Sequence, residues 1–250
     1  MRSSGYLTAM VAATLAAWGG RAAAGGDELR VIVQEQCLPH WLQAHDPAPC
    51  ESLGAPDSAG TQPAYAVLHD RKGGAHFLLI PTRTVRGIDE REVLGPEAPN
   101  YFAAAWLARG TLSGAAGRDI PRAAVGMAIN PLRSRSQDQL HIHLECLRVA
   151  VYQGLRQAAD ELRSTWSRVR IDGADYQALR VSGAELAANP FALIAAGVPG
   201  AMNHYTLLVA GMEFRDGPGF AVLVQTEGVP AGELLLDSSC AVTQRGPRET

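Results

Sequence analysis

The stretch QLHIHLECL, residues 139–147, alternates polar and apolar side chains. Because successive side chains of a β-strand point to opposite faces, this alternation predicts a strand with one face in the core. The apolar face consists of Leu140, Ile142, Leu144 and Cys146. The polar face consists of Gln139, His141, His143 and Glu145. Neighbours on one face lie about 7 Å apart, so an amide, two imidazoles and a carboxylate stand in one row.

Two imidazoles in such a row have three interpretations. The first is a solvated strand face. The second is a metal site, in which His141 and His143 supply two zinc ligands and a third is needed. The third is nucleophilic catalysis on phosphorus, because a largely neutral imidazole has a ring nitrogen free to attack. The remaining histidines show no companion ligand spacing: His40, His45, His69, His76 and His204.

The sequence before this strand predicts a helix, a loop, a hairpin, a second helix and a further strand. Turn residues in RKGG separate the two hairpin strands, and the further strand ends at Asn130. The predicted ranges are 27–36 for the first helix, 46–63 for the loop, 64–70 and 75–82 for the hairpin, 99–112 for the second helix and 124–130 for the last strand.

The sequence after it predicts two helices and a second hairpin. Apolar residues recur at helical spacing over 149–168, and Ser182 with Glu185 forms a capping box that opens a short helix. Strands at 204–213 and 219–227 flank the turn FRDGPG. The whole pattern predicts an α+β fold, an antiparallel sheet with packed helices, and contains no linker long enough to separate independent domains.

Composition and charge narrow the class of protein. The chain has 250 residues, of which 47% are hydrophobic and 19% charged. This is enough to bury a full core in one large domain or two small ones. The formal net charge is −3 and no basic stripe is present, which argues against a nucleic-acid partner.

The N-terminus has the features of an export segment. Arg2 precedes an uncharged run over residues 3–20, and Ala22-Ala23-Ala24 forms a small-residue cleavage site before Gly25. The run is near the minimum of roughly 18 residues for a membrane span. Residues 1–24 are therefore predicted to be a cleaved signal peptide or a retained membrane anchor. Either prediction puts residues 27–250 outside the cytoplasm.

Four cysteines in an exported chain predict disulfides, with three connectivities to choose from. Cys37 and Cys50 flank a proline-rich loop that a local disulfide would close. That pairing leaves Cys146 with Cys240, a bridge whose long loop is worth roughly 4 kcal/mol in the chain-entropy model. The cysteine spacing fits no CxxC zinc site.

The histidine strand resembles the motif of the histidine-triad (HIT) superfamily, His-x-His-x-His with apolar residues between. Within that superfamily the chain is similar to the CDP-diacylglycerol pyrophosphatase family over residues 28–240. The shared features, in order, are the export segment, EQCLP…PAPC, LLIPT, APN, AIN, SQDQLHIHLEC and a final cysteine. The resemblance implies a HIT-like fold, with halves at about 28–150 and 151–250 as a duplication of which the first half keeps the histidines.

The resemblance also implies a reaction: hydrolysis of the diphosphate of CDP-diacylglycerol to CMP and phosphatidate, in phospholipid metabolism. It makes His141 the nucleophile that forms a nucleotidyl intermediate, and His143 a contact to a phosphate oxygen. Gln139 stands where the superfamily has its first histidine; it can donate a hydrogen bond but cannot relay a proton. Further substrate contacts are expected from Asn130, Ser136 and Gln137.

The remaining expectations concern partners and place. A metal or other cofactor is not expected, and the partners are a lipid-linked cytidine nucleotide and a membrane surface. The resemblance places the protein at the bacterial inner membrane facing the periplasm, or in the periplasm if the signal is cleaved. Two alternatives remain: a HIT-type hydrolase or nucleotidyltransferase on another nucleoside diphosphate or polyphosphate, and a non-catalytic envelope binding module.

Overall fold

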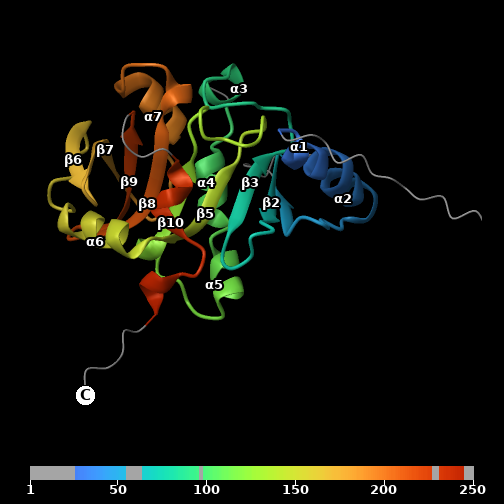
Figure 1. The fold of residues 1–250 in the computed structure, drawn as a ribbon, viewed down its shortest axis with the longest axis horizontal. Helices are drawn as coiled ribbons and strands as arrows, with labels where there is room; N and C mark the ends of the chain where they lie inside the picture. The colour runs from blue at the N-terminus through green and yellow to red at the C-terminus, as the bar shows by residue number, and fades with distance from the viewer. Residues whose placement is uncertain (1–25, 55–63, 96–97, 227–230, 245–250) are drawn as a thin grey trace, which may run out of the picture.

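The computed structural model describes residues 26–54, 64–95, 98–226 and 231–244, and its centre is one antiparallel sheet (Figure 1). Nine strands follow the order β1-β2-β3-β5-β4-β8-β9-β7-β6, and a tenth, β10, pairs with β5. The strands are β1 Ser52–Gly54, β2 Tyr65–His69, β3 Phe77–Pro81, β4 Val125–Ile129, β5 Ile142–Leu147, β6 Ser167–Ile171, β7 Ala174–Ser182, β8 Thr206–Phe214, β9 Gly217–Gln225 and β10 Leu236–Asp237. The predicted α+β class is confirmed.

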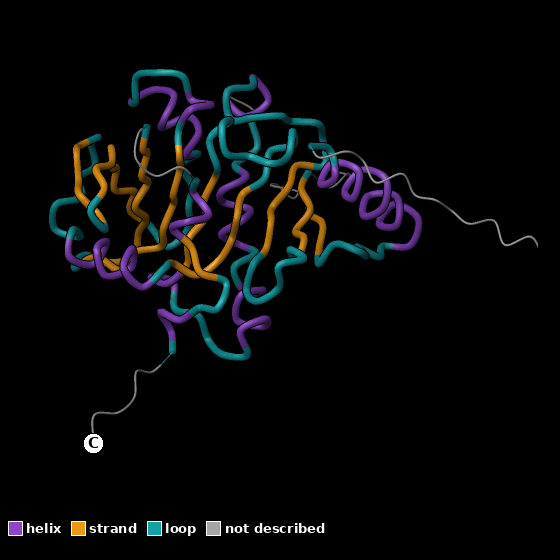
Figure 2. Tube along the Cα trace, viewed as in Figure 1, coloured by secondary structure: helices purple, strands orange, loops and turns teal. Residues whose placement is uncertain are grey.

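Helices lie on both faces of this sheet (Figure 2). They are α1 Glu28–Ile32, α2 Leu38–Ala44, α3 Arg91–Leu94, α4 Tyr101–Leu107, α5 Gly110–Ala116, α6 Val149–Gln157 and α7 Pro190–Gly197. Within the part of the chain that the structure describes, no helix combines the length and apolarity needed to cross a membrane. The predicted signal or anchor at 1–24 falls outside the described residues.

The two halves of the sheet repeat one order of elements. Strands β2 and β3 are followed by helices and then by β4 and β5, and strands β6 and β7 are followed by α7 and then by β8 and β9. In space the order is β2-β3-β5-β4 in one half and β6-β7-β9-β8 in the other. The duplication and the HIT-like relationship remain predictions, because a shared strand order does not establish common descent.

The predicted hairpins are confirmed, whereas the four predicted helices differ. Strands β2 with β3 and β8 with β9 pair as expected. The first helix runs on beyond residue 36, through a π-helical turn at Val33–Cys37 into α2. The second helix divides at residues 108–109 into α4 and α5.

The helix predicted at 149–168 is wrong in its second half. Helix α6 ends at Gln157, and Ser167–Ile171 forms the edge strand β6. Ser182 is the last residue of β7 rather than a helix cap. The next helix begins at Pro190, where the side chain of Asn189 accepts the Phe191 N–H at 3.1 Å. The error in the 149–168 helix has one cause: Val169 fits both the helical period and the strand period, and pairing with β7 decides between them.

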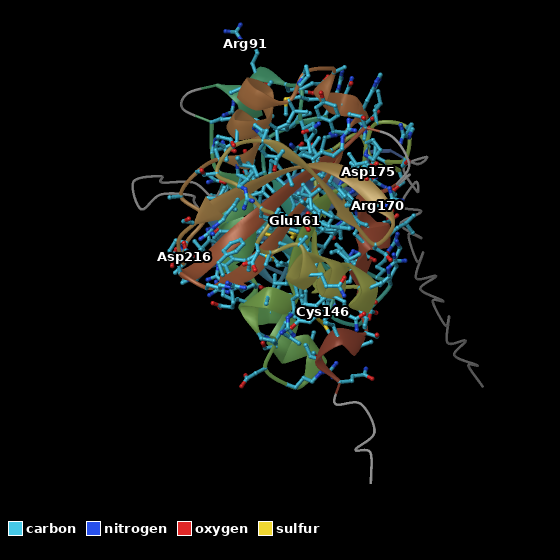
Figure 3. All side chains as sticks on the ribbon, turned by 90° about the vertical axis from the view of Figure 1, so that its left-hand side faces the viewer. Arg91, Cys146, Glu161, Arg170, Asp175 and Asp216 are labelled. Carbon is cyan, nitrogen blue, oxygen red and sulfur yellow. A yellow bond between two sulfur atoms is a disulfide. The ribbon has the colours of Figure 1, made fainter. Side chains whose placement is uncertain are left out.

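The charged edge of the sheet lies away from the histidine strand. Figure 3 views the molecule from the side of β6 and β7 and labels Arg170 and Asp175, which form an ion pair of 3.2 Å between these strands. Charges on an edge strand discourage pairing with another chain. We therefore treat this edge as a protected boundary rather than as a binding site.

One face of the sheet is covered by α4, α5 and α7. The strand predicted to begin at residue 139 begins at Ile142, but the apolar side chains of 139–147 belong to this core as period two predicts: Leu140, Ile142, Leu144 and Cys146. Trp106 on α4 is 1% exposed, lies 4.7 Å from the Phe220 ring centroid, and donates its Nε1–H to the Ala184 carbonyl at 3.2 Å. These contacts make Trp106 a core residue.

Replacing Trp106 with phenylalanine is expected to lower the free energy of unfolding by about 2 kcal/mol, since a buried hydrogen bond and part of a ring are lost. The KM for substrate should stay unchanged, because the ring lies in the core. Urea unfolding and steady-state kinetics measure the two quantities. Leu107, which is 61% exposed on the same helix, is the matched control. A rise in KM without loss of stability would contradict the core assignment.

The other face of the sheet carries helices at its two ends, and the C-terminal segment lies on β4 and β5 between them. Helices α1 and α2 pack on β2 and β3 through a cluster that includes Leu29, Val33 and Ile80. Helix α6 packs on the other half through Val151 and Leu155. Figure 1 shows α1 with α2 at the β2 end and α6 towards the β6 end. The polar face of β5 lies in the interval between these two helical covers.

Two disulfides tie the chain together with the predicted connectivity. Cys37 bonds Cys50 at the α1–α2 end. Cys146 on β5 bonds Cys240, which follows β10. The second bridge holds the C-terminal segment across the end of β5, where Leu236 and Asp237 pair with β5. The second half of the chain therefore returns to the histidine strand.

Candidate active site

A cleft of about 930 Å³ opens over the polar face of β5. Its walls come from α1, the β2–β3 turn, the loop before β5 and the C-terminal segment. Five of the six residues expected to act on substrate line it: Asn130, Ser136, Gln137, His141 and His143. These side chains lie far apart in sequence from the cleft residues of α1 and the C-terminal segment, and the sheet brings them together.

His141 lies on the cleft floor with one tautomer fixed by geometry. Its Nδ1 is 2.8 Å from the backbone oxygen of Gln139. A carbonyl oxygen only accepts, so Nδ1 carries the proton and the lone pair of Nε2 is free. The residue is 7% exposed, and burial lowers the pKa of its imidazole below the usual value. The solvated-face interpretation of this strand is therefore wrong.

Gln139 is fully buried next to the nucleophile candidate and is not among the residues that line the cleft. Its side-chain amide donates to the carbonyl oxygens of Pro81 at 2.9 Å and Arg83 at 2.8 Å. Its Oε1 accepts the N–H of Val85 at 3.3 Å. These bonds fasten the chain after β3 to the start of β5, and thereby hold the carbonyl that orients His141.

His143 lies two residues after His141, with its ring edge-on to that of His141 at a centroid distance of 5.0 Å. Its Nε2 lies 3.4 Å from the side-chain nitrogen of Asn130, and its Nδ1 lies 3.1 Å from Nε2 of His76. Burial holds the pKa of His143 well below the usual value. The ring therefore bridges the cleft and a cluster beneath it.

Beneath His143 lies a cluster that sequence spacing did not reveal. His76 Nε2 is 3.3 Å from Glu145 Oε1, and His76 Nδ1 is 3.8 Å from Asp70 Oδ1. Burial raises the pKa of Glu145 to about 8, and the nearby carboxylate of Glu233 adds to the rise. Burial also lowers the pKa of His76. Several titratable groups are thus packed together under the cleft floor.

The register explains why His76 reaches this place. Phe77 pairs with Leu144 and Leu78 with His143, so the next position puts His76 opposite Glu145. Nothing in the spacing of the histidines along the chain indicates this pairing. It follows only from knowing that β3 and β5 are neighbours in the sheet.

Charged and apolar side chains both line the cleft. Lys72 from the β2–β3 turn pairs with Glu233 of the C-terminal segment at 3.1 Å. The backbone N–H of Glu233 donates to Asn130 Oδ1 at 3.2 Å, which fixes this segment against the cleft. Apolar side chains also line the cleft: Leu29, Ile32, Leu68 and Leu78. A ligand with a charged part and an apolar part would match this combination.

An α+β fold whose cleft holds an oriented imidazole with a free nitrogen, next to further donors and a lysine, defines a candidate phosphohydrolase. Sequence comparison then gives the family. The family profile described as CDP-diacylglycerol pyrophosphatase matches residues 24–244, so the chain belongs to this family of hydrolases.

A curated relative supports the same assignment. The protein named CDP-diacylglycerol pyrophosphatase from Yersinia pestis is 35% identical over 232 residues, which cover 88% of this chain and 86% of the relative. The family resemblance inferred from the ordered motifs is thereby confirmed. The roles of individual site residues remain predictions.

Proposed function

We propose that this chain hydrolyses the diphosphate of CDP-diacylglycerol to CMP and phosphatidate, with His141 as the nucleophile. The observation that carries the proposal is the 2.8 Å hydrogen bond from His141 Nδ1–H to the Gln139 carbonyl, which leaves Nε2 unprotonated on the cleft floor. Family membership supplies the substrate class.

In the first step, the Nε2 lone pair forms a bond to the phosphorus next to cytidine. The bond from this phosphorus to the bridging oxygen breaks, and phosphatidate leaves with the electron pair. A phosphate monoester is a tolerable leaving group, so this step needs little help from an acid. The role of Gln139 is then to position His141 rather than to relay a proton, which fits its bonds to the chain after β3.

In the second step, a water oxygen attacks the phosphorus of the nucleotidyl-histidine. The phosphorus–nitrogen bond breaks, its electron pair returns to Nε2, and CMP leaves as the water proton is released to solvent. The Nδ1 hydrogen bond to Gln139 holds the ring in place through both steps. Atoms and charge balance without a further reactant.

Charge on the phosphoryl oxygens is expected to be met by the donors around His141. His143 and Asn130 lie side by side on the cleft floor, and Lys72 stands at its mouth. Preorganised donors of this kind stabilise charge as it develops in the transition state. Gln137 accepts the Leu29 N–H at 3.2 Å and so holds α1 as one wall of the cleft.

The apolar side chains of the cleft are assigned to the diacylglycerol end of the substrate, with the membrane surface beyond it. We also propose that the folded chain works on the periplasmic side of the inner membrane or in the periplasm. Its two disulfides support this location, since such bonds persist in oxidising compartments.

Replacing Ile32 on the apolar wall with asparagine is expected to raise the KM for long-chain CDP-diacylglycerol by roughly 10-fold, which corresponds to about 1.4 kcal/mol of lost apolar contact. The KM for a CDP-alcohol without acyl chains should not change. Kinetics with both substrates in detergent micelles measures the difference. Equal effects on the two substrates would contradict the assignment of this wall to lipid.

Trapping the intermediate tests the mechanism directly. A short incubation with CDP-diacylglycerol, followed by acid-free quenching and mass spectrometry, should detect a CMP adduct on the peptide that contains His141. Dinucleoside polyphosphates tested alongside distinguish the lipid substrate from a soluble nucleotide. An absence of both adduct and CMP release would favour a non-catalytic binding module.

A further inference from the structure

A second set of side chains, apart from the nucleophile, gathers metal-binding atoms in the interior. Within the described residues, His76, His143 and Glu145 each offer one ligand atom, and these atoms all lie within 4.8 Å of one another. The three residues are 3%, 5% and 5% exposed. His143 and Glu145 lie on β5, and His76 directly precedes the neighbouring strand β3, so the sheet fixes their positions.

The separations suit a small divalent ion with nitrogen and oxygen ligands. Ligand atoms about 2.0–2.1 Å from a tetrahedral zinc ion lie roughly 3.3 Å from one another. His76 Nε2 is 3.1 Å from His143 Nδ1 and 3.3 Å from Glu145 Oε1. The set of two imidazoles and one carboxylate is a common one for zinc with an open fourth position.

The surroundings also have the features of a metal site. Asp70 Oδ1 lies 3.8 Å from His76 Nδ1, on the side of the ring away from the cluster. This distance is too long for a hydrogen bond, so the carboxylate acts on the ring through its charge alone, which favours a nearby cation. A cation would further compensate Glu145, a carboxyl group that is otherwise costly to bury in charged form.

We propose that His76, His143 and Glu145 bind one divalent transition-metal ion, Zn²⁺ in the first place, beneath the cleft floor. Three protein ligands leave the fourth position for water. This site differs from the zinc site considered from the sequence, in which His141 and His143 were the two histidine ligands. Here His76 takes the place of His141, and Glu145 is the third ligand.

The ion would have a consequence for His143, and this part of the inference rests on the proposed function. A neutral imidazole bound to metal through Nδ1 carries its proton on Nε2. That proton is then available to a phosphoryl oxygen in the cleft. The cost to Asn130 is small, because its nitrogen lies 3.4 Å from His143 Nε2, which is long for a hydrogen bond.

The test uses tag-free full-length protein, stripped with EDTA and dialysed. Isothermal titration with Zn²⁺ should show one ion per chain at micromolar or lower Kd. Co²⁺ should give the intense visible absorption of a tetrahedral site. His76→Gln and Glu145→Gln should each weaken binding by roughly 100-fold, since a ligand is lost. Circular dichroism establishes that the variants are folded.

Two control variants separate this site from other histidines and from the proposed function. His204→Gln removes an exposed histidine, and His141→Ala removes the nucleophile; both should bind zinc like the wild type. If the His141→Ala protein still binds zinc, the metal site is supported whether or not the wild type forms a CMP adduct. Absence of one-to-one binding, or undiminished binding by both ligand variants, would overturn the site.

Discussion

Replacing His141 with alanine should lower kcat on CDP-diacylglycerol by roughly 10⁴-fold or more, since losing a nucleophile removes the route of the reaction. The protein should stay folded, because the strand and its apolar face remain in the core. Steady-state release of CMP, measured with far-UV circular dichroism on the same preparation, checks both statements.

The structure offers a close comparison for this variant. His143→Ala should lose roughly 10²- to 10³-fold, the range for one donor to a developing charge, rather than the whole activity. Added imidazole should restore part of the turnover of His141→Ala, because a free ring can occupy the emptied position. Substantial turnover by His141→Ala without imidazole would be incompatible with His141 as the nucleophile.

The row of polar side chains on β5 and on the residues just before it could be predicted because a strand has a period of two. The residues that period two assigned to the core, Ile142 among them, are there, and His141 and His143 share the opposite face as expected. This prediction needs nothing beyond the strand itself. It therefore holds for any order of the strands in the rest of the sheet.

The surroundings of that row were not predictable in the same way. His76 meets Glu145 through the register of β3 on β5, and Glu233 meets Asn130 because the C-terminal segment returns to the first half of the sheet. Both contacts depend on strand order, which local patterns do not encode. The role of Gln139 shows the same limit, since its partners are backbone groups of another segment.

Helix and strand were confused where one apolar residue satisfied both periods. In the segment after α6, Val169 continues the helical spacing from Leu155 and Leu162, yet it forms part of β6. The preference for β6 comes from pairing with β7 and not from the segment alone. Pairing across the short turn at Asp172 and Gly173, and not the helical spacing of the segment, therefore decided the structure at this point.

Removing the Cys146–Cys240 bridge by a double alanine substitution should lower the free energy of unfolding by roughly 4.5 kcal/mol, from the chain entropy of a long closed loop. The bridge closes a sequence separation of 94 residues and holds the segment that carries Glu233 across the end of β5. Turnover should also fall, because that segment forms one wall of the cleft. Urea unfolding under non-reducing conditions measures the stability.

The other bridge provides a control within the same molecule. Cys37–Cys50 closes a separation of 13 residues at the α1–α2 end, for which the same entropy argument gives roughly 3 kcal/mol. Its removal should leave the C-terminal wall in place. An equal or smaller stability loss at Cys146–Cys240 would contradict the loop-length argument. Unchanged turnover there would show that the C-terminal segment keeps its position without the covalent tie, through β10 and the Glu233–Asn130 hydrogen bond.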